Sequence, residues 1–523
     1  MSPLRRILMA LCVFSLTGGG ASAQPEQKLG TVSFANSCAA SVQPELQRAV
    51  ALLHSFWWKE ADDAFAEVLA HDPSCAIATW GIATVAMGNP FGTGATPAAA
   101  QKAMAAIGQG RRIGAKTERE RGYIEAIAAY YDRFDQQKPA QRLRSLADAF
   151  ALLAEKYPDD DETQIFFALY LTATQPPTDK TLSRAMAAVV ILNQQFAKHP
   201  DHPGVAHYLI HSNDFPAIAA QGLIAANCYA QIAPDAPHAL HMPSHIFTRV
   251  GMWKESAETN RRSIEAARRA GGATDELHAD DYMIYADLQM ARDEDAWRVV
   301  EAVRSFTDTN RAADYAKAAI PARYAVERSA WRDAARLAGL EVSKFPYTSA
   351  IRIFARALGA ARSGDPEGAG RDLARLEEIE AALKAAREDY WAAEVRVQEL
   401  AGRAWIAQAK GDREQALSLM RAAADEEDLS DKSSVSPGRL IPARELLGDM
   451  LLEDGRAAEA LAEYEAALKR DPRRFRSLSG AAQAAAAANN SDEARHYYGL
   501  LVEMAGAGDA RPELVIARQY LAR

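Results

Sequence analysis

Two pairs of histidines repeat at a fixed interval in the middle of the chain. His207 and His211 are four residues apart, and His241 and His245 repeat this spacing 34 residues later. A spacing of four places two side chains on one face of an α-helix, and two imidazoles one turn apart can chelate a divalent metal ion. Because residues 199–285 hold eight of the eleven histidines, we expect a functional site there.

Three interpretations of these histidines are open. The first is a metal site formed by His207, His211, His241 and His245. Imidazole with carboxylate suits a divalent zinc or copper ion, and nickel or iron as well, and the sequence does not choose among them. The second interpretation is a groove that hydrogen-bonds an organic or peptide ligand. The third is a polar seam with a purely structural role.

The interval between the pairs also predicts the elements that carry them. Thirty-four residues is the length of one helix-turn-helix repeat. Strand signals are nearly absent, and Ala, Leu, Glu and Arg dominate windows with helical spacing, which predicts an all-α chain. The repeat is plainest near the C-terminus. There, small residues stand where two helices would cross, an aromatic side chain fills the groove and proline ends the unit: Gly448, Gly455, Ala460, Tyr464, Ala467 and Pro472.

On these residues the chain resembles tetratricopeptide repeat (TPR) proteins. The resemblance covers most of the chain and implies a right-handed α-solenoid of helix-turn-helix repeats. We expect one array over residues 24–424, a flexible polar linker over residues 425–438 and a shorter C-terminal array over residues 439–523. The linker is expected because acidic residues, serine, proline and glycine dominate its composition.

The resemblance further implies which side chains line the concave groove, where TPR proteins bind their partners. In that register, three neighbouring repeats between residues 199 and 285 direct polar side chains into one groove. These are His207, His211 and Asp214 from the first, His238, His241, His245 and Thr248 from the second, and His278, Asp281 and Tyr285 from the third. Asp214 and Asp281 are also expected to accept hydrogen bonds from imidazole N–H groups.

The function implied by the resemblance is recognition of a protein or peptide. We therefore expect a binding scaffold with a histidine-rich groove rather than an enzyme. The alternative is a metal-dependent hydrolase or oxidase, in which the histidines are ligands and Asp214 or Asp281 is the base. The sequence lacks the Gly-x-Ser-x-Gly, Walker, His-Glu-x-x-His and dinucleotide-binding patterns of other enzymes.

The first 23 residues have the pattern of a cleaved signal peptide. Arg5 and Arg6 precede a short apolar run over residues 7–16, and small residues at positions 21–23 offer a cleavage site. We therefore expect a periplasmic or secreted protein. The apolar run is too short to span a bilayer, and no later stretch reaches 18 consecutive apolar residues, so we expect no membrane-spanning segment.

Charge and cysteine content restrict the expectations further. The formal net charge is -9, and basic residues are scattered among acidic ones, so nucleic acid is not an expected partner. Export permits disulfide bonds. Cys38 and Cys75 lie 37 residues apart, and each precedes the opening helix of a repeat. They could therefore form a disulfide that closes the N-terminal end.

Overall fold

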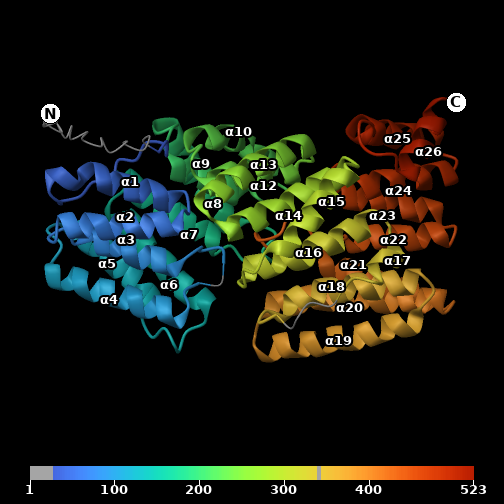
Figure 1. Ribbon diagram of the computed structural model, residues 1–523, viewed down its shortest axis with the longest axis horizontal. Coiled ribbons are helices and arrows are strands. Elements are labelled where there is room, and N and C mark those ends of the chain that lie inside the picture. Colours follow the sequence, from blue (N-terminus) through green and yellow to red (C-terminus); the bar gives the residue numbers. More distant parts are fainter. Residues whose placement is uncertain (1–26, 93, 339–342) are drawn as a thin grey trace, which may run out of the picture.

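The protein is an array of α-helices. The computed structural model describes residues 27–92, 94–338 and 343–523, and over these residues the regular structure is entirely helical, with no strand (Figure 1). The expected all-α fold class is thus confirmed. The expected signal peptide over residues 1–23 lies outside the described residues.

The helices follow one another along the chain with short connections. The N-terminal half contains α1 (Gln43–His54), α2 (Trp58–His71), α3 (Ile77–Met87), α4 (Pro97–Ile113), α5 (Glu118–Tyr131), α6 (Pro139–Lys156), α7 (Asp161–Ala173), α8 (Ser183–Lys198), α9 (Pro203–Asn213), α10 (Leu223–Ile232), α11 (Pro237–His241), α12 (Pro243–Arg249) and α13 (Trp253–Ala270). The C-terminal half contains α14 (Ala273–Gln289), α15 (Asp293–Ala302), α16 (Arg311–Glu327), α17 (Trp331–Ala334), α18 (Pro346–Arg362), α19 (Pro366–Ala385), α20 (Asp389–Ala409), α21 (Arg413–Glu427), α22 (Ala443–Glu453), α23 (Ala457–Arg470), α24 (Phe475–Ala487), α25 (Ser491–Ala505) and α26 (Pro512–Leu521). Three short 3₁₀ turns, Ala40–Val42, Ala219–Gly222 and Val303–Ser305, complete the described helices.

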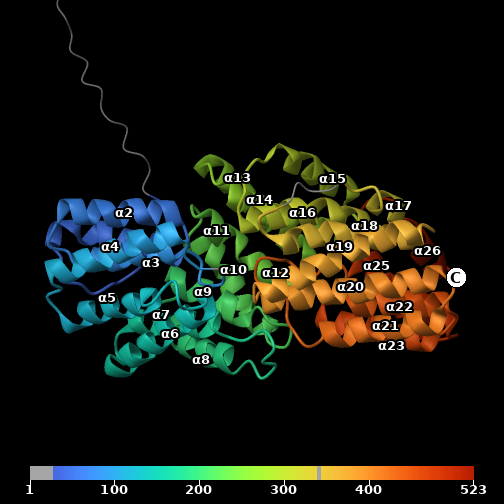
Figure 2. The same cartoon turned by 90° about the horizontal axis from the view of Figure 1, so that it is seen from below.

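The helices stack as a solenoid. Each helix packs on the next one in sequence, and alternate helices also contact one another, for example α3 with α5, α14 with α16, and α18 with α20. A unit that contacts only its neighbours in a series is the defining arrangement of repeat proteins. Figures 1 and 2 show the blue and teal helices at one end of the molecule, the green ones in the middle and the orange and red ones at the other end.

Small residues allow neighbouring helices to approach closely, as the sequence predicted. Gly448 of α22 and Gly480 of α24 both face the buried ring of Tyr464 of α23. A Cβ atom at Gly480 would lie 2.3 Å from this ring, and one at Gly448 would lie 2.9 Å from it. Any larger side chain at either position would therefore push the helices apart.

Each half of the solenoid curls back on itself. At the N-terminal end α1 contacts α9, and in the C-terminal half α24 contacts α14. The indole N–H of Trp253 donates to the carbonyl of Arg473 over 2.8 Å, and the N–H of Asp509 donates to the carbonyl of Ala291 over 2.7 Å. These contacts join segments that lie far apart in the sequence.

A disulfide joins the segment before α1 to the start of α3. Cys38 and Cys75 are bonded, with their Cα atoms 4.7 Å apart. Closing a loop of this size reduces the entropy of the unfolded chain and stabilises the folded end by about 4 kcal/mol.

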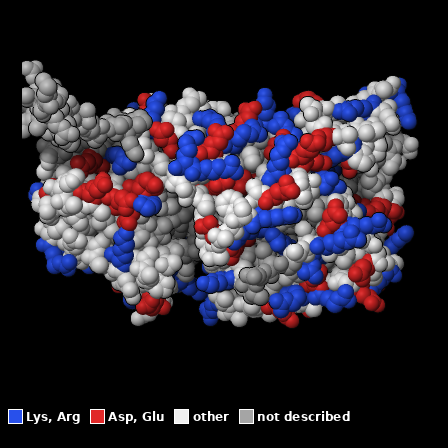
Figure 3. Space-filling model, in the orientation of Figure 1, with Lys and Arg blue, Asp and Glu red and all other residues white. Residues whose placement is uncertain are grey.

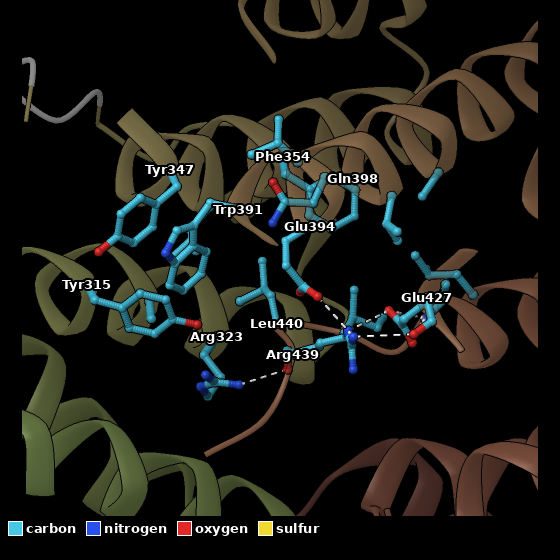
Figure 4. A pocket seen from close by; sticks show the side chains of 18 residues that line it. Tyr315, Arg323, Tyr347, Phe354, Trp391, Glu394, Gln398, Glu427, Arg439 and Leu440 are labelled. Atoms are coloured by element: carbon cyan, nitrogen blue, oxygen red, sulfur yellow. Dashed lines mark hydrogen bonds and ion pairs between the residues drawn. The ribbon is translucent and has the colours of Figure 1, made fainter. Parts of the chain in front are cut away.

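The segment of residues 425–438 is not a flexible linker, contrary to our expectation. Helix α21 continues to Glu427, and the chain then runs through the interior, with Asp431 and Ser436 buried. Arg439, which follows the segment, reaches Glu394 and Glu427, and its carbonyl accepts from Arg323 (Figure 4). Arg323 also donates to the carbonyl of Gly438. The polar composition that suggested solvation is satisfied by these internal partners, which local sequence does not reveal.

Basic and acidic side chains are mixed on the face of the protein drawn in Figure 3, as the sequence predicted. Within the described ranges, no helix combines the length and the apolar character needed to cross a bilayer.

A buried ion network fastens the C-terminal helices to the middle of the array. Arg474 lies just before α24 and is fully buried. Its guanidinium contacts Glu445 of α22 at 3.0 Å and Glu327 of α16 at 2.8 Å. It also donates to the hydroxyl of Tyr285 of α14 over 2.5 Å.

We predict that Arg474→Met destabilises the protein by about 3–5 kcal/mol, because it leaves the buried carboxylate of Glu327 without its cation and leaves Glu445 with Arg476 alone. Arg473→Met is the matched control. The Arg473 side chain is 37% exposed and pairs with Glu503 on the surface, so its loss costs about 0–1 kcal/mol. Urea denaturation followed by circular dichroism measures both free energies of unfolding. Equal losses in the two variants would contradict the role given to the network.

Candidate metal centre

Six histidines converge in the middle of the array, from α9, α11, α12 and α14. They form two groups of three, and within each group the ligand nitrogens lie within 4.8 Å of one another. The first group is His207, His211 and His238, and the second is His241, His245 and His278. The groups adjoin each other, since the rings of His211 and His245 have centroids 5.7 Å apart. We call the six imidazoles the histidine centre.

Prolines define the helices that carry the histidine centre. Pro203 occupies the first turn of α9, and the side chain of His202 caps this helix by accepting from the N–H of Val205. Pro237 begins α11 and Pro243 begins α12. Because proline has no N–H and fixes its own φ, it starts each of these short helices and limits how far the preceding one extends.

Three of the imidazoles are held by hydrogen bonds on the nitrogen that faces away from the centre. Nδ1 of His207 lies 2.6 Å from the carbonyl oxygen of His54, and Nδ1 of His241 lies 2.7 Å from Oδ1 of Asn260. Nδ1 of His245 lies 2.9 Å from Oδ2 of Asp214. A carbonyl or carboxylate oxygen only accepts, so each Nδ1 carries the proton. This tautomer leaves the lone pair on Nε2, as in metal-binding histidines.

The Nε2 atoms of these rings face one another across short distances. Nε2 of His207 lies 3.2 Å from Nε2 of His238, and Nε2 of His241 lies 3.1 Å from Nε2 of His245. Nε2 of His211 is buried and has no hydrogen-bond partner among the described residues. A buried nitrogen lone pair without a donor is unfavourable. A metal ion between the rings would satisfy these lone pairs together.

Burial keeps the imidazoles in the neutral form that binds metals. Burial, together with a smaller effect of neighbouring imidazoles, lowers the pKa of His207 and of His278 to about 3. Burial likewise lowers the pKa of His211, His238 and His241 well below the ordinary value. The pKa of His245 is also lowered by burial, although Asp214 opposes the shift.

The histidine centre is not on an open concave groove, contrary to our expectation. His207, His211, His241 and His245 are exposed by 0%, 5%, 2% and 1%, and only His238 and His278 of the six are partly exposed. The groove is filled because the solenoid curls tightly and because residues 428–442 pack inside it. Aromatic rings add to the covering. Phe91 stacks on His211 with centroids 3.9 Å apart, and Phe56 stacks on His238 at 5.5 Å.

Phe56, one of the aromatic residues that cover the histidine centre, has a strained backbone. Phe56 has a φ of +53°, in the left-handed region that a bulky residue rarely adopts. Its ring contacts His207 as well as His238. Strained residues of this kind persist where the surrounding structure holds them and often lie at functional sites.

Three residues expected in the groove point elsewhere. Asp281 pairs with Arg323 at 3.3 Å, and Tyr285 belongs to the Arg474 network. Thr248 bonds to Ser256. On α14 the side chains that reach the histidine centre are His278 and, one turn later, Tyr282, whose ring centroid lies 4.8 Å from that of His241. The prediction that Asp281 and Tyr285 of α14 face the same groove as His278 was therefore wrong.

Asp214 supports the centre instead of joining it. Its carboxylate accepts from His245, from Arg249 at 2.7 Å and from Lys432 at 3.1 Å. Burial alone would raise the pKa of Asp214, but Lys432 and Arg249 hold it well below the ordinary value. The carboxylate thus stays ionised and fixes the orientation of His245, which is the acceptor role predicted from the sequence.

A second buried group of polar side chains, around Glu162, fixes the position of His54 at the end of α1. The carboxylate of Glu162 lies 3.0 Å from Nε2 of His54 and 3.0 Å from Nε2 of His202, and Nδ1 of His54 lies 2.9 Å from the hydroxyl of Tyr208. All ring nitrogens of His54 are therefore satisfied. This arrangement holds the His54 carbonyl in place for His207, and we assign it a supporting role.

Sequence reasoning missed several parts of the centre. His238 and His278 were placed in the groove but not among the ligands, although the spacing of His238 from His241 also fits one helix face. Asn260 and Lys432 carry no local signal. Lys432 is 218 residues from Asp214, and only the folded chain brings them together.

Comparisons with known proteins give helical neighbours of low identity. No protein-family model and no curated protein sequence matches this chain. Among solved structures, it is similar to a tetratricopeptide repeat protein from Parabacteroides merdae, with 9% identity, 77% of this chain and 98% of that chain covered and a TM-score of 0.23. It is also similar to the Cut9–Hcn1 hetero-tetramer of the APC/C, with 12% identity, coverage of 92% and 97% and a TM-score of 0.31. The contacts between successive and alternate helices define the fold as an α-solenoid.

We predict that the metal-free protein loses stability as the pH falls below about 6.5. The imidazoles of His207 and His278 take up protons near pH 6.5 in the unfolded chain but only near pH 3 in the folded one. Their stabilising contribution is therefore fully present above pH 6.5 and is lost towards pH 3. The free energy of unfolding should fall by about 3 kcal/mol per pH unit from these two groups.

Urea denaturation at pH 7, 6 and 5 in the presence of a chelator measures this dependence. The double variant His207→Asn and His278→Asn should have a shallower slope than the wild type. His496→Asn, on the exposed face of α25, is the control and should keep the wild-type slope. An unchanged slope in the double variant would show that the two imidazoles are not the cause.

Proposed function

We propose that this protein binds two transition-metal ions side by side in its interior, each held by three imidazoles. The first ion would bind His207, His211 and His238, and the second would bind His241, His245 and His278. The observation that carries the proposal is the convergence of Nε2 atoms whose partner Nδ1 atoms already donate to fixed acceptors. This is the arrangement by which proteins orient histidine ligands before a metal arrives.

The hydrogen-bonding pattern favours metal binding over a structural polar seam. In a seam, each buried acceptor would meet a donor. Here His241 and His245 turn lone pairs towards each other at 3.1 Å, and Nε2 of His211 meets no donor in the described part of the chain. A cation bound between the rings removes both defects.

Three ligands for each ion leave a coordination position open. Structural zinc sites are closed by four protein ligands, whereas catalytic sites keep a position for water or substrate. Two metal ions that lie next to each other can act on one small molecule together. We therefore favour a reactive metal centre, as in the metal-dependent oxidase or hydrolase that the sequence suggested as an alternative.

A protein or peptide partner belongs to a separate part of the proposal. The solenoid offers a large outer surface, and helical repeats commonly recognise proteins. Such a partner would bind elsewhere on the array, because the histidine centre is buried. We also propose that the protein is exported. The disulfide between Cys38 and Cys75 supports export, since disulfides persist in oxidising compartments.

Metal stoichiometry tests the proposed centre. We expect about two ions per chain in the purified protein after loading and dialysis, measured by elemental analysis. His211→Ala and His245→Ala each remove one ligand from a different group and should each reduce the content by about one ion. His496→Ala lies on the surface and should keep both ions. Retention of both ions by the two ligand variants would contradict the assignment, as would a folded protein that retains none.

The supporting hydrogen bonds give a finer prediction. Asn260→Leu removes the acceptor for Nδ1 of His241 without removing a ligand. Loss of such a supporting bond typically weakens metal binding by about 10–100-fold. We expect this decrease in affinity for one of the two bound ions. Competition with a chromophoric chelator measures the affinity. Thr259→Val, which alters the neighbouring side chain that bonds to the Leu240 carbonyl, is the control for packing. Equal effects of the two substitutions would indicate a general disturbance of α13.

A further inference from the structure

The charge around the histidine centre restricts which ions it can hold. The ligands of the two groups in the histidine centre are six imidazoles, without a carboxylate or a thiolate. The carboxylate that touches the centre, Asp214, is shared with two cations, Arg249 and Lys432. Next to the centre, Asp281 is paired with Arg323. The protein therefore brings no net negative charge to balance the charge of bound metal.

The electrostatic repulsion between two ions bound in the histidine centre depends strongly on their charge. By Coulomb's law, two neighbouring divalent ions repel each other about four times as strongly as two monovalent ions at the same separation. The positive ends of Arg249 and Lys432 add to this repulsion, and each acts about twice as strongly on a divalent ion. Burial prevents water from screening these charges. An uncompensated pair of divalent ions is thus strongly disfavoured.

Coordination number leads to the same conclusion. Each group offers three nitrogens, whereas zinc is usually four-coordinate and other divalent first-row ions commonly take more ligands. Water would have to supply the remaining positions. The rings of Phe56, Phe91 and Tyr282 lie against His238, His211 and His241 and reduce the space for it. A dry site with three nitrogens suits an ion that is stable at low coordination number.

We infer that the resting centre holds two copper(I) ions, one in each group of three imidazoles. Copper(I) carries a single charge and accepts three nitrogen ligands without a fourth, and copper is among the metals that imidazole binds. The inference rests on the proposed two-metal function and identifies its metal. It does not require an anionic ligand or a bound water.

Competition between metals tests the inference. Full-length protein, freed of metal with a chelator, is incubated without oxygen with equimolar copper(I) and zinc(II), and bound metal is counted by elemental analysis. We expect two copper ions and less than about a tenth of a zinc ion per chain. X-ray absorption at the copper edge should show three nitrogen ligands and the monovalent state. Two zinc ions per chain would overturn copper(I) but leave the two-metal proposal intact, and binding of neither metal would overturn both.

A charge substitution tests the electrostatic argument itself. Lys432→Met removes a buried cation, 4% exposed, that lies near the centre but is not a ligand. The charge of Lys432 repels a divalent ion with about twice the energy with which it repels a monovalent ion. The fold-increase in zinc(II) affinity of the variant should therefore be about the square of the fold-increase in copper(I) affinity. Lys180→Met is the matched control, since Lys180 is 47% exposed and pairs with Asp431 of the same segment. Equal factors for the two metals in Lys432→Met would refute the argument from charge.

Discussion

The hydrogen bond from His207 to the carbonyl of His54 connects the geometry of the histidine centre with the curvature of the solenoid. On one side it fixes an imidazole so that its Nε2 faces the interior. On the other it requires α1 to return to α9, which happens only because the solenoid curls tightly. Glu162 supports the same contact by holding the ring of His54. The superhelical curvature and the chemistry of the histidine centre are therefore a single constraint, since a more open array would separate the imidazole from its acceptor.

Residues 428–442 complete this interior from the other half of the chain. Lys432 meets the carboxylate of Asp214, and the hydroxyl of Tyr282 donates to the carbonyl of Ser436 over 3.0 Å. The same segment continues to Arg439, which joins α20 and α21 through Glu394 and Glu427 (Figure 4). The polar residues of this segment lose their hydration when the chain folds and gain hydrogen bonds inside the protein. These hydrogen bonds compensate for the cost of burial, because each one involves a charged partner or a backbone carbonyl.

The sequence predicted what depends on short-range spacing. The all-α solenoid follows from helical periodicity and from small residues opposite Tyr464, and the proximity of His207 to His211 and of His241 to His245 follows from their spacing of four. The burial of these rings did not follow, because it results from contacts such as that between Trp253 and Arg473, 220 residues apart. Composition likewise suggested a solvated segment at residues 425–438, since polar residues look alike whether their partners are water or protein.

The inward course of residues 428–442 has a consequence for the order of events during biosynthesis. The six imidazoles belong to residues 207–278, so they emerge from the ribosome well before Lys432 and Ser436. During that interval the helices that bear them lack their final covering. Metal can therefore reach the six imidazoles during that interval before residues 428–442 pack beside them, whereas in the finished protein the same exchange must pass this segment.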